Sequence, residues 1–98
     1  MYTTMKNEEL RKLLDTDYPD TILFDNPAYD NSIVGISTDG CLVYDFYKMA
    51  KELSEDDNIT IEDAIEFIEY NAVRALPYVP YETRPIIVDF RFLELYNE

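Results

Sequence analysis

The sequence predicts an α+β fold, in which a small three-stranded antiparallel sheet is packed by two to three helices. One long stretch, residues 60–78, has apolar residues at helical spacing. Two β-prone runs flank an Asp-Gly pair, and a third lies near the end of the chain. The 98 residues fit one domain, residues 1–98, with the last strand paired to the hairpin and helices covering one face of the sheet.

The chain is expected to begin with a helix at residues 5–15, whose apolar positions are Met5, Leu10, Leu13 and Leu14. Asn7 is a candidate N-cap, and Arg11 lies where a cation suits the C-terminal end of the helix dipole. A short edge strand is predicted at residues 21–24. Residues 25–32 that follow are rich in turn-forming Asp, Asn, Pro and Ser.

A β-hairpin is predicted from the runs at residues 33–36 and 41–44, because they flank Asp39 and Gly40. Gly35 inside the first run indicates either a bulge or close approach by a bulky neighbour. The last strand of the sheet is predicted further along the chain, at residues 86–92, after a loop rich in proline. Residues 93–98 are expected to fray or to dock loosely.

Two helices are predicted between the hairpin and the last strand. Asp45 caps the first, whose buried stripe is Phe46, Met49, Ala50 and Leu53. Residues 54–58 form an acidic connector. Thr60 caps the second helix, residues 60–78, and Pro77 ends it. The apolar stripe of this second helix is Ile61, Ile65, Ile68, Ala72 and Ala75, with Ala64 and Phe67 beside it.

The composition argues against catalysis and against a bound cofactor. The chain has no histidine, the commonest general base and metal ligand. Asp25 and Asp30 could be taken for paired catalytic carboxylates, but no partner for them is visible, so no catalytic residue is predicted. Cys41 is expected in the core. A calcium site is a weaker alternative because EF-hand spacing is absent, and its candidate ligands are Asp56, Asp57, Asn58 and Glu62.

The N-terminus lacks the apolar segment of a signal peptide, and no apolar run approaches the ~20 residues of a membrane span. We therefore expect a cytoplasmic protein. Twenty-one acidic residues against eight basic ones give a net charge of −13. Such a charge disfavours nucleic acid and anionic membranes as partners and favours basic surfaces.

The acidic residues of the second helix follow a pattern. Glu62, Glu66 and Glu69 stand at i, i+4 and i+7, about 5–6 Å apart and comparable to successive phosphates of a nucleic-acid strand. One interpretation is a surface that imitates a phosphate backbone; the other is a solvated face that only keeps the protein soluble. The candidate partner-binding residues are Asp56, Asp57, Glu62, Asp63, Glu66 and Glu69.

A second candidate surface is the loop that contains Asp25, Asn26, Tyr29, Asp30 and Asn31. Arg74 is expected to pair with an acid of this loop. The tyrosines of predicted loops are candidates for stacking on a partner's arginine, and they are Tyr18, Tyr29, Tyr78 and Tyr81. The tyrosines expected to be partly buried are Tyr44, Tyr47 and Tyr70.

Three segments have a distinctive sequence: D-N-P-A-Y-D-N-S-I-V-G-I-S-T-D-G-C-L-V-Y-D at 25–45, A-I-E-F-I-E-Y-N-A-V-R-A-L-P-Y at 64–78 and R-P-I-I-V at 84–88. Together they resemble a group of small acidic proteins from phages and mobile elements of Gram-positive bacteria. Small acidic proteins of such elements are often inhibitors of host defence, and anti-CRISPR proteins are the best-known class. The resemblance therefore implies a Cas9-type effector nuclease as the target.

The expected function is inhibition of such an effector in the bacterial host cell, by occupation of its basic DNA-binding surface. The alternative is a phage structural or regulatory interaction module, without catalysis, whose acidity only provides solubility. In that case the tyrosine-bearing loops would contact the partner.

Overall fold

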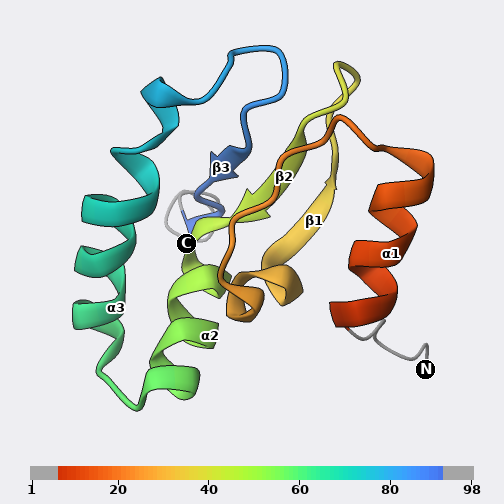
Figure 1. Cartoon of the computed structure of the whole chain (residues 1–98). Coiled ribbons are helices and arrows are strands. Elements are labelled where there is room, and N and C mark those ends of the chain that lie inside the picture. The colour runs from red at the N-terminus through yellow and green to blue at the C-terminus, as the bar shows by residue number, and fades with distance from the viewer. Residues whose placement is uncertain (1–6, 92–98) are drawn as a thin grey trace.

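The computed structural model describes residues 7–91 and has the predicted α+β class (Figure 1). A sheet of three short strands lies between α1 and α3, with α2 below it in this view. In chain order the elements are α1 (Asn7–Asp17), the 3-10 helix η1 (Pro27–Ser32), β1 (Ile33–Ile36), β2 (Leu42–Asp45), α2 (Phe46–Asp57), α3 (Ile61–Ile68), the π-helical turn η2 (Glu69–Val73), the 3-10 turn η3 (Leu76–Tyr78) and β3 (Ile86–Val88).

The sheet is mixed, so the prediction of a wholly antiparallel sheet was wrong for the last strand. β1 and β2 pair antiparallel, whereas β2 and β3 run parallel, with Val43 opposite Ile86 and Asp45 opposite Val88. A parallel pair of strands needs a crossover connection, and helices α2 and α3 provide it between β2 and β3. Within the predicted range 86–92, the strand covers only Ile86–Val88, and Phe92 lies outside the described residues, as do 93–98.

The hairpin is confirmed. The Ser37 amide donates to the Cys41 carbonyl at 2.7 Å, and Gly40 turns the chain with a φ of 90°. The register shifts between Ile33 and Gly35, which is the bulge that a glycine inside a strand indicated. No atom lies within 4 Å of the position that a Gly35 Cβ would take, so close approach is not the reason for this glycine.

The start of α2 is as predicted, but its end is not. The Asp45 carboxylate accepts from the Lys48 amide at 3.2 Å, and the stripe Phe46, Met49, Ala50 and Leu53 is buried. Residues 54–57, predicted as a connector, form the last turn of the helix instead. The helix ends at Asn58, which adopts a left-handed conformation with a φ of 56°, and its amide donates to the Ser54 carbonyl.

The long helix predicted at 60–78 is divided. Thr60 caps it as expected, since its hydroxyl accepts from the Asp63 amide at 3.1 Å. The α-helix ends at Ile68 and widens into the π turn, where the Arg74 amide donates to the Glu69 carbonyl at 3.3 Å. Pro77 lies within η3 and does not follow the α-helix directly. The buried face is formed by Ala64, Ile68 and Ala72, and Ala75 is exposed.

The N-terminal part packs across the core without adding a strand. Helix α1 is described from residue 7, so the predicted start at Met5 lies outside the described range. The prediction of a strand at residues 21–24 was wrong, because this stretch runs extended over the hairpin and pairs with no strand of the described chain. Instead, the Phe24 amide donates to the Tyr44 hydroxyl at 3.2 Å, and the two rings meet edge to face.

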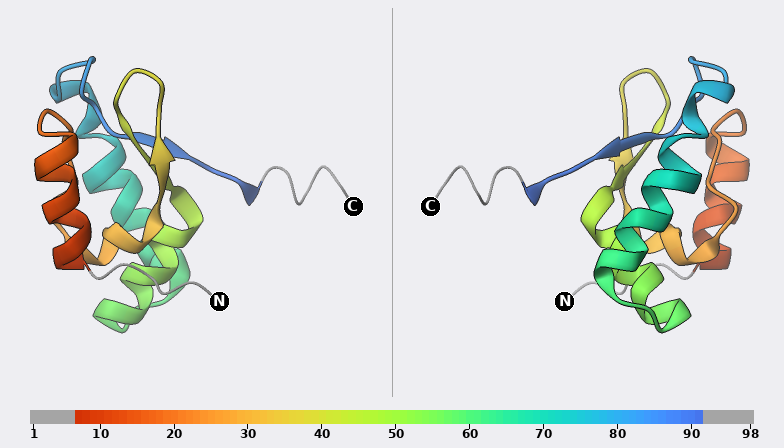
Figure 2. Two further views of the ribbon diagram at one scale, coloured as in Figure 1. Left: turned by 90° about the vertical axis from the view of Figure 1, so that its right-hand side faces the viewer. Right: turned by 90° about the vertical axis from the view of Figure 1, so that its left-hand side faces the viewer.

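The core lies where the helices meet one face of the sheet. Leu42 and Tyr44 of β2 are buried, whereas Val43 and Asp45, which alternate with them, are half-buried. In the two side views α1 lies to one side of the hairpin and α2 lies below it (Figure 2). Leu42 and Tyr44 belong to one hydrophobic cluster with helix residues that include Met49, Leu53 and Ile68. No described helix is long and apolar enough to cross a bilayer.

Candidate partner-binding surface

The outward side of α3 carries the predicted row of glutamates. Glu62 and Glu66 are exposed on the helix, and Glu69 keeps helical angles (φ −60°, ψ −42°) at the start of the π turn. The three carboxylates therefore stay one above another on the side opposite Ala64 and Ile68. They are held there by the burial of those apolar side chains and by the Thr60 cap.

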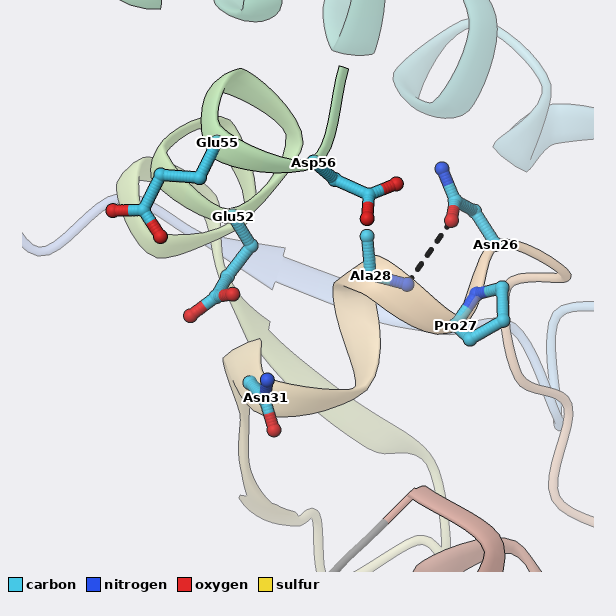
Figure 3. Close-up of a pocket in the computed structure, with 7 residues that line it drawn as sticks. All are labelled: Asn26, Pro27, Ala28, Asn31, Glu52, Glu55 and Asp56. Atoms are coloured by element: carbon cyan, nitrogen blue, oxygen red, sulfur yellow. Dashed lines mark hydrogen bonds between the residues drawn. The ribbon is translucent and has the colours of Figure 1, made fainter. Parts of the chain in front are cut away.

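Asp56 and Asp57 are also exposed, but they belong to the last turn of α2. The structure places Asp56 against η1 and not in one hollow with the α3 glutamates (Figure 3). A hollow of about 420 Å³ there is lined by Asn26, Pro27, Ala28, Asn31, Glu52, Glu55 and Asp56. Within residues 7–91, no three acidic or cysteine side chains are grouped closely enough to hold a metal ion.

The second candidate surface is largely part of the core. Asp30 is 2% exposed and Tyr29 is 5% exposed, so neither side chain can reach a partner. Asn26 is occupied as a cap, since its side-chain oxygen accepts from the Ala28 amide at 3.0 Å. Of the five residues predicted for this surface, Asp25 and Asn31 are left exposed.

Arg11 holds the buried Asp30 carboxylate, a contact that the sequence did not indicate. Its Nε donates to Oδ2 at 2.8 Å and its Nη2 to Oδ1 at 3.0 Å, and Nη2 also donates to the Phe24 carbonyl at 3.1 Å. The prediction that Arg74 pairs with this loop was wrong. Arg11 and Asp30 are far apart in the sequence, so no local pattern could have joined them.

Three pKa values report on this interior. The hydrogen bond to Asp30 raises the pKa of Arg11 above its ordinary value. Burial raises the pKa of Tyr44 to about 12, against the opposing effect of the Phe24 amide, and the nearby Asp30 charge adds to the rise. Burial likewise raises the pKa of Tyr29. Tyr29, Asp30 and Tyr44 are therefore shielded from water, and the Asp30 carboxylate is matched by the guanidinium of Arg11.

Aromatic side chains lie beside the acidic row of α3. Phe67 is 48% exposed and Tyr70 is 67% exposed, although the sequence predicted both to be at least partly buried. With Asp63, Glu66 and Asn71 they line a shallow hollow of about 320 Å³. The guanidinium of Arg74 lies 4.7 Å from the centre of the Tyr70 ring. The spacing of 63, 67, 70 and 74 along a helix could have indicated this second row.

The other tyrosines divide between the surface and the interior. Tyr18, Tyr78 and Tyr81 are exposed, as predicted for loop residues, whereas Tyr47 is half-buried and Tyr44 is fully buried. The ion pairs of the described chain are Arg11–Asp30 and Arg91–Asp89. None of the six acids predicted to bind a partner forms an ion pair within that part of the chain. Their charge is thus available to a molecule outside it.

Comparisons of the chain with protein-family models, with curated proteins and with solved structures gave no match.

Proposed function

We propose that this protein inhibits a nucleic-acid-binding protein by occupying its basic surface as an acidic imitation of the phosphate backbone. The observation that carries the proposal is the row Glu62, Glu66 and Glu69. These carboxylates are exposed on one side of α3 and have no ion-pair partner in residues 7–91, in a chain of net charge −13.

The energetic argument starts from the placement of like charges. Glutamates at i and i+4 repel one another by about 0.2–0.5 kcal/mol per pair, so this row lowers the stability of the free helix. A basic groove would reverse that penalty, because its lysines and arginines neutralise the row and counterions are released from the two charged surfaces, much as counterions are released from DNA when a protein binds it. Binding driven in this way weakens steeply as salt rises.

For the target we propose a CRISPR effector nuclease of the Cas9 type, in the cytoplasm of the bacterial host. The resemblance of segments 25–45, 64–78 and 84–88 to small acidic proteins of phages and mobile elements supports this class. Such nucleases hold DNA in positively charged channels and read a short duplex motif with arginines. An acidic helix of this kind would compete with DNA for those cations.

The test is cleavage of target DNA by a guide-loaded Cas9-type nuclease in the presence of the protein. We expect the triple variant E62Q/E66Q/E69Q to inhibit about tenfold less well, since each exposed charge contact contributes roughly 0.5 kcal/mol. The matched control is D15N/D17N/D20N, which removes the same charge from exposed positions at the opposite end of the chain. Equal loss in both variants would mean that only net charge matters, and unchanged inhibition by the triple variant would place the site elsewhere.

A second candidate function is an interaction module of a phage, structural or regulatory, whose acidity only keeps it soluble. It is favoured by the loop around η3, where Tyr78 is 89% exposed and Tyr81 is 79% exposed. A pulldown from a Gram-positive host lysate, washed at low and then high salt, separates the two. A nuclease that elutes with salt or with competing DNA supports imitation of DNA. A partner indifferent to both, but lost with Tyr78→Ala and Tyr81→Ala, supports the module.

A further inference from the structure

A second row of side chains runs beside the glutamates on α3 and η2. Asp63, Phe67, Tyr70 and Arg74 follow one another at i, i+4, i+7 and i+11. Tyr70 and Phe67 are among the most exposed large hydrophobic side chains of the described chain. Glu66 links the two rows because it also lines their hollow. Phe67 and Tyr70 are thus exposed on the surface beside the carboxylates of Asp63 and Glu66.

The π turn contributes to this presentation. It begins at Glu69 and contains Tyr70, Asn71, Ala72 and Val73. Ala72 stays in the core, while Tyr70 and Val73 remain exposed. The Asn71 side chain donates to the Phe67 carbonyl at 2.9 Å, which ties the turn to the helix under the hollow. Irregular turns of this kind are frequent at binding sites.

The hollow has the chemistry that a guanidinium requires. The face of an aromatic ring carries partial negative charge and attracts a cation, and a carboxylate beside it accepts the N–H groups of a planar fork. The chain itself makes half of this arrangement, since Arg74 lies 4.7 Å from the Tyr70 ring centre without an ion pair among the described residues. Lysine is less suited, because its compact ammonium is more strongly hydrated.

We propose that the hollow lined by Asp63, Glu66, Phe67, Tyr70 and Asn71 binds an arginine side chain of a basic protein partner. Arg74 already covers one face of Tyr70, so the partner's guanidinium pairs with the carboxylates and packs against the remaining exposed surface of Phe67 and Tyr70. The surface therefore selects arginine over lysine. This inference rests on the proposed function, since it names the partner's residue at the same helix. It adds a selectivity that imitation of phosphates alone does not provide.

The test uses two peptides of equal charge, nona-arginine and nona-lysine, whose binding to the full chain is measured by calorimetry at one ionic strength. We expect the arginine peptide to bind about two- to fivefold more tightly, the range of an exposed cation–π contact. Tyr70→Leu, which keeps an apolar side chain but removes the ring, should lower the ratio of the two affinities. Tyr70→Phe should retain the preference.

The matched control is Tyr78→Leu, because Tyr78 is a still more exposed tyrosine outside the hollow. Equal affinities of the wild-type protein for both peptides, or the same loss of preference in Tyr78→Leu, would overturn the arginine site. The variant E62Q/E69Q tests the proposed function separately, since both residues lie outside the hollow. It should weaken both peptides equally and keep their ratio. Failure to weaken either would count against the imitation of phosphates while leaving the arginine preference standing.

Discussion

The protein uses the arginines Arg11 and Arg74 in opposite ways. Arg11 reaches inward and satisfies a carboxylate whose side chain is 0% exposed. Arg74 lies on the surface over the ring of Tyr70, which is 67% exposed. In the first region the charges are matched inside the chain and serve the fold. In the second the acids exceed the cations, and the excess is left for a partner.

The largest effect is expected when the Arg11–Asp30 ion pair is lost. Arg11→Met leaves the Asp30 carboxylate buried without its guanidinium, and we expect the free energy of unfolding to fall by about 3 kcal/mol. Urea titration followed by circular dichroism measures it. Asp30→Asn should be milder, because Arg11 is 35% exposed and can be hydrated. If Arg11→Met lowered the free energy of unfolding by less than about 1 kcal/mol, the Arg11–Asp30 pair would not stabilise the fold more than the exposed Arg74–Tyr70 contact does.

The region around Asp30 and Tyr44 should also make the fold less stable at high pH. The pKa of Tyr44 is raised by burial from 10.0 to about 12, so the folded protein retains a proton that the unfolded chain releases above pH 10. The stabilisation is complete below pH 10 and is lost as pH rises toward 12, by about 2–3 kcal/mol.

Urea midpoints at pH 8, 10 and 11.5 test this prediction, together with tyrosinate absorbance. Tyr44→Phe should be less stable at neutral pH, because the Phe24 amide loses its acceptor, but its stability should fall less at high pH. An equally steep fall in Tyr44→Phe would assign the pH dependence to another group.

Mutation of the α3 glutamates should stabilise the protein, whereas mutation of Arg11 should destabilise it. E62Q/E66Q/E69Q removes repulsion along α3 and should raise the free energy of unfolding by about 0.5–1 kcal/mol at low salt. The gain should shrink as salt is added, because exposed charges are screened. Thermal unfolding at 20 and 500 mM NaCl measures both effects. A lower free energy of unfolding in the variant would mean that these glutamates stabilise the fold and are not free to serve a partner alone.

The smallest effect is expected for the outer arginine. Arg74→Met removes an exposed contact with Tyr70, for which about 0.5 kcal/mol is the expected contribution. The same urea titration used for Arg11→Met measures it. A loss as large as that of Arg11→Met would contradict the distinction between the two arginines.

Local chemistry predicted the elements well. The Thr60 and Asp45 caps, the turn at Gly40 and the bulge at Gly35 each depend on residues within a few positions of one another. Their sequence signals therefore suffice.

Two of the failures involve partners distant in the chain. The direction of β3 depends on how α2 and α3 return the chain, and the burial of Asp30 depends on Arg11. For the candidate surface, the exposure of Glu62, Glu66 and Glu69 followed from spacing. The exposure of Tyr70 was missed, although its place in the row 63, 67, 70 and 74 indicated it.

The parallel pairing of β3 has a consequence for the order of folding. Leu42–Asp45 meets Ile33–Ile36 across a short turn, but it meets Ile86–Val88 only after both intervening helices are in place. β3 lies at the edge of the sheet. Closing the longer loop costs more chain entropy, so we expect β3 to join the sheet late. In native-state hydrogen exchange, the amides of Ile86–Val88 should therefore exchange through local opening while those of Leu42–Asp45 remain protected until the whole chain unfolds.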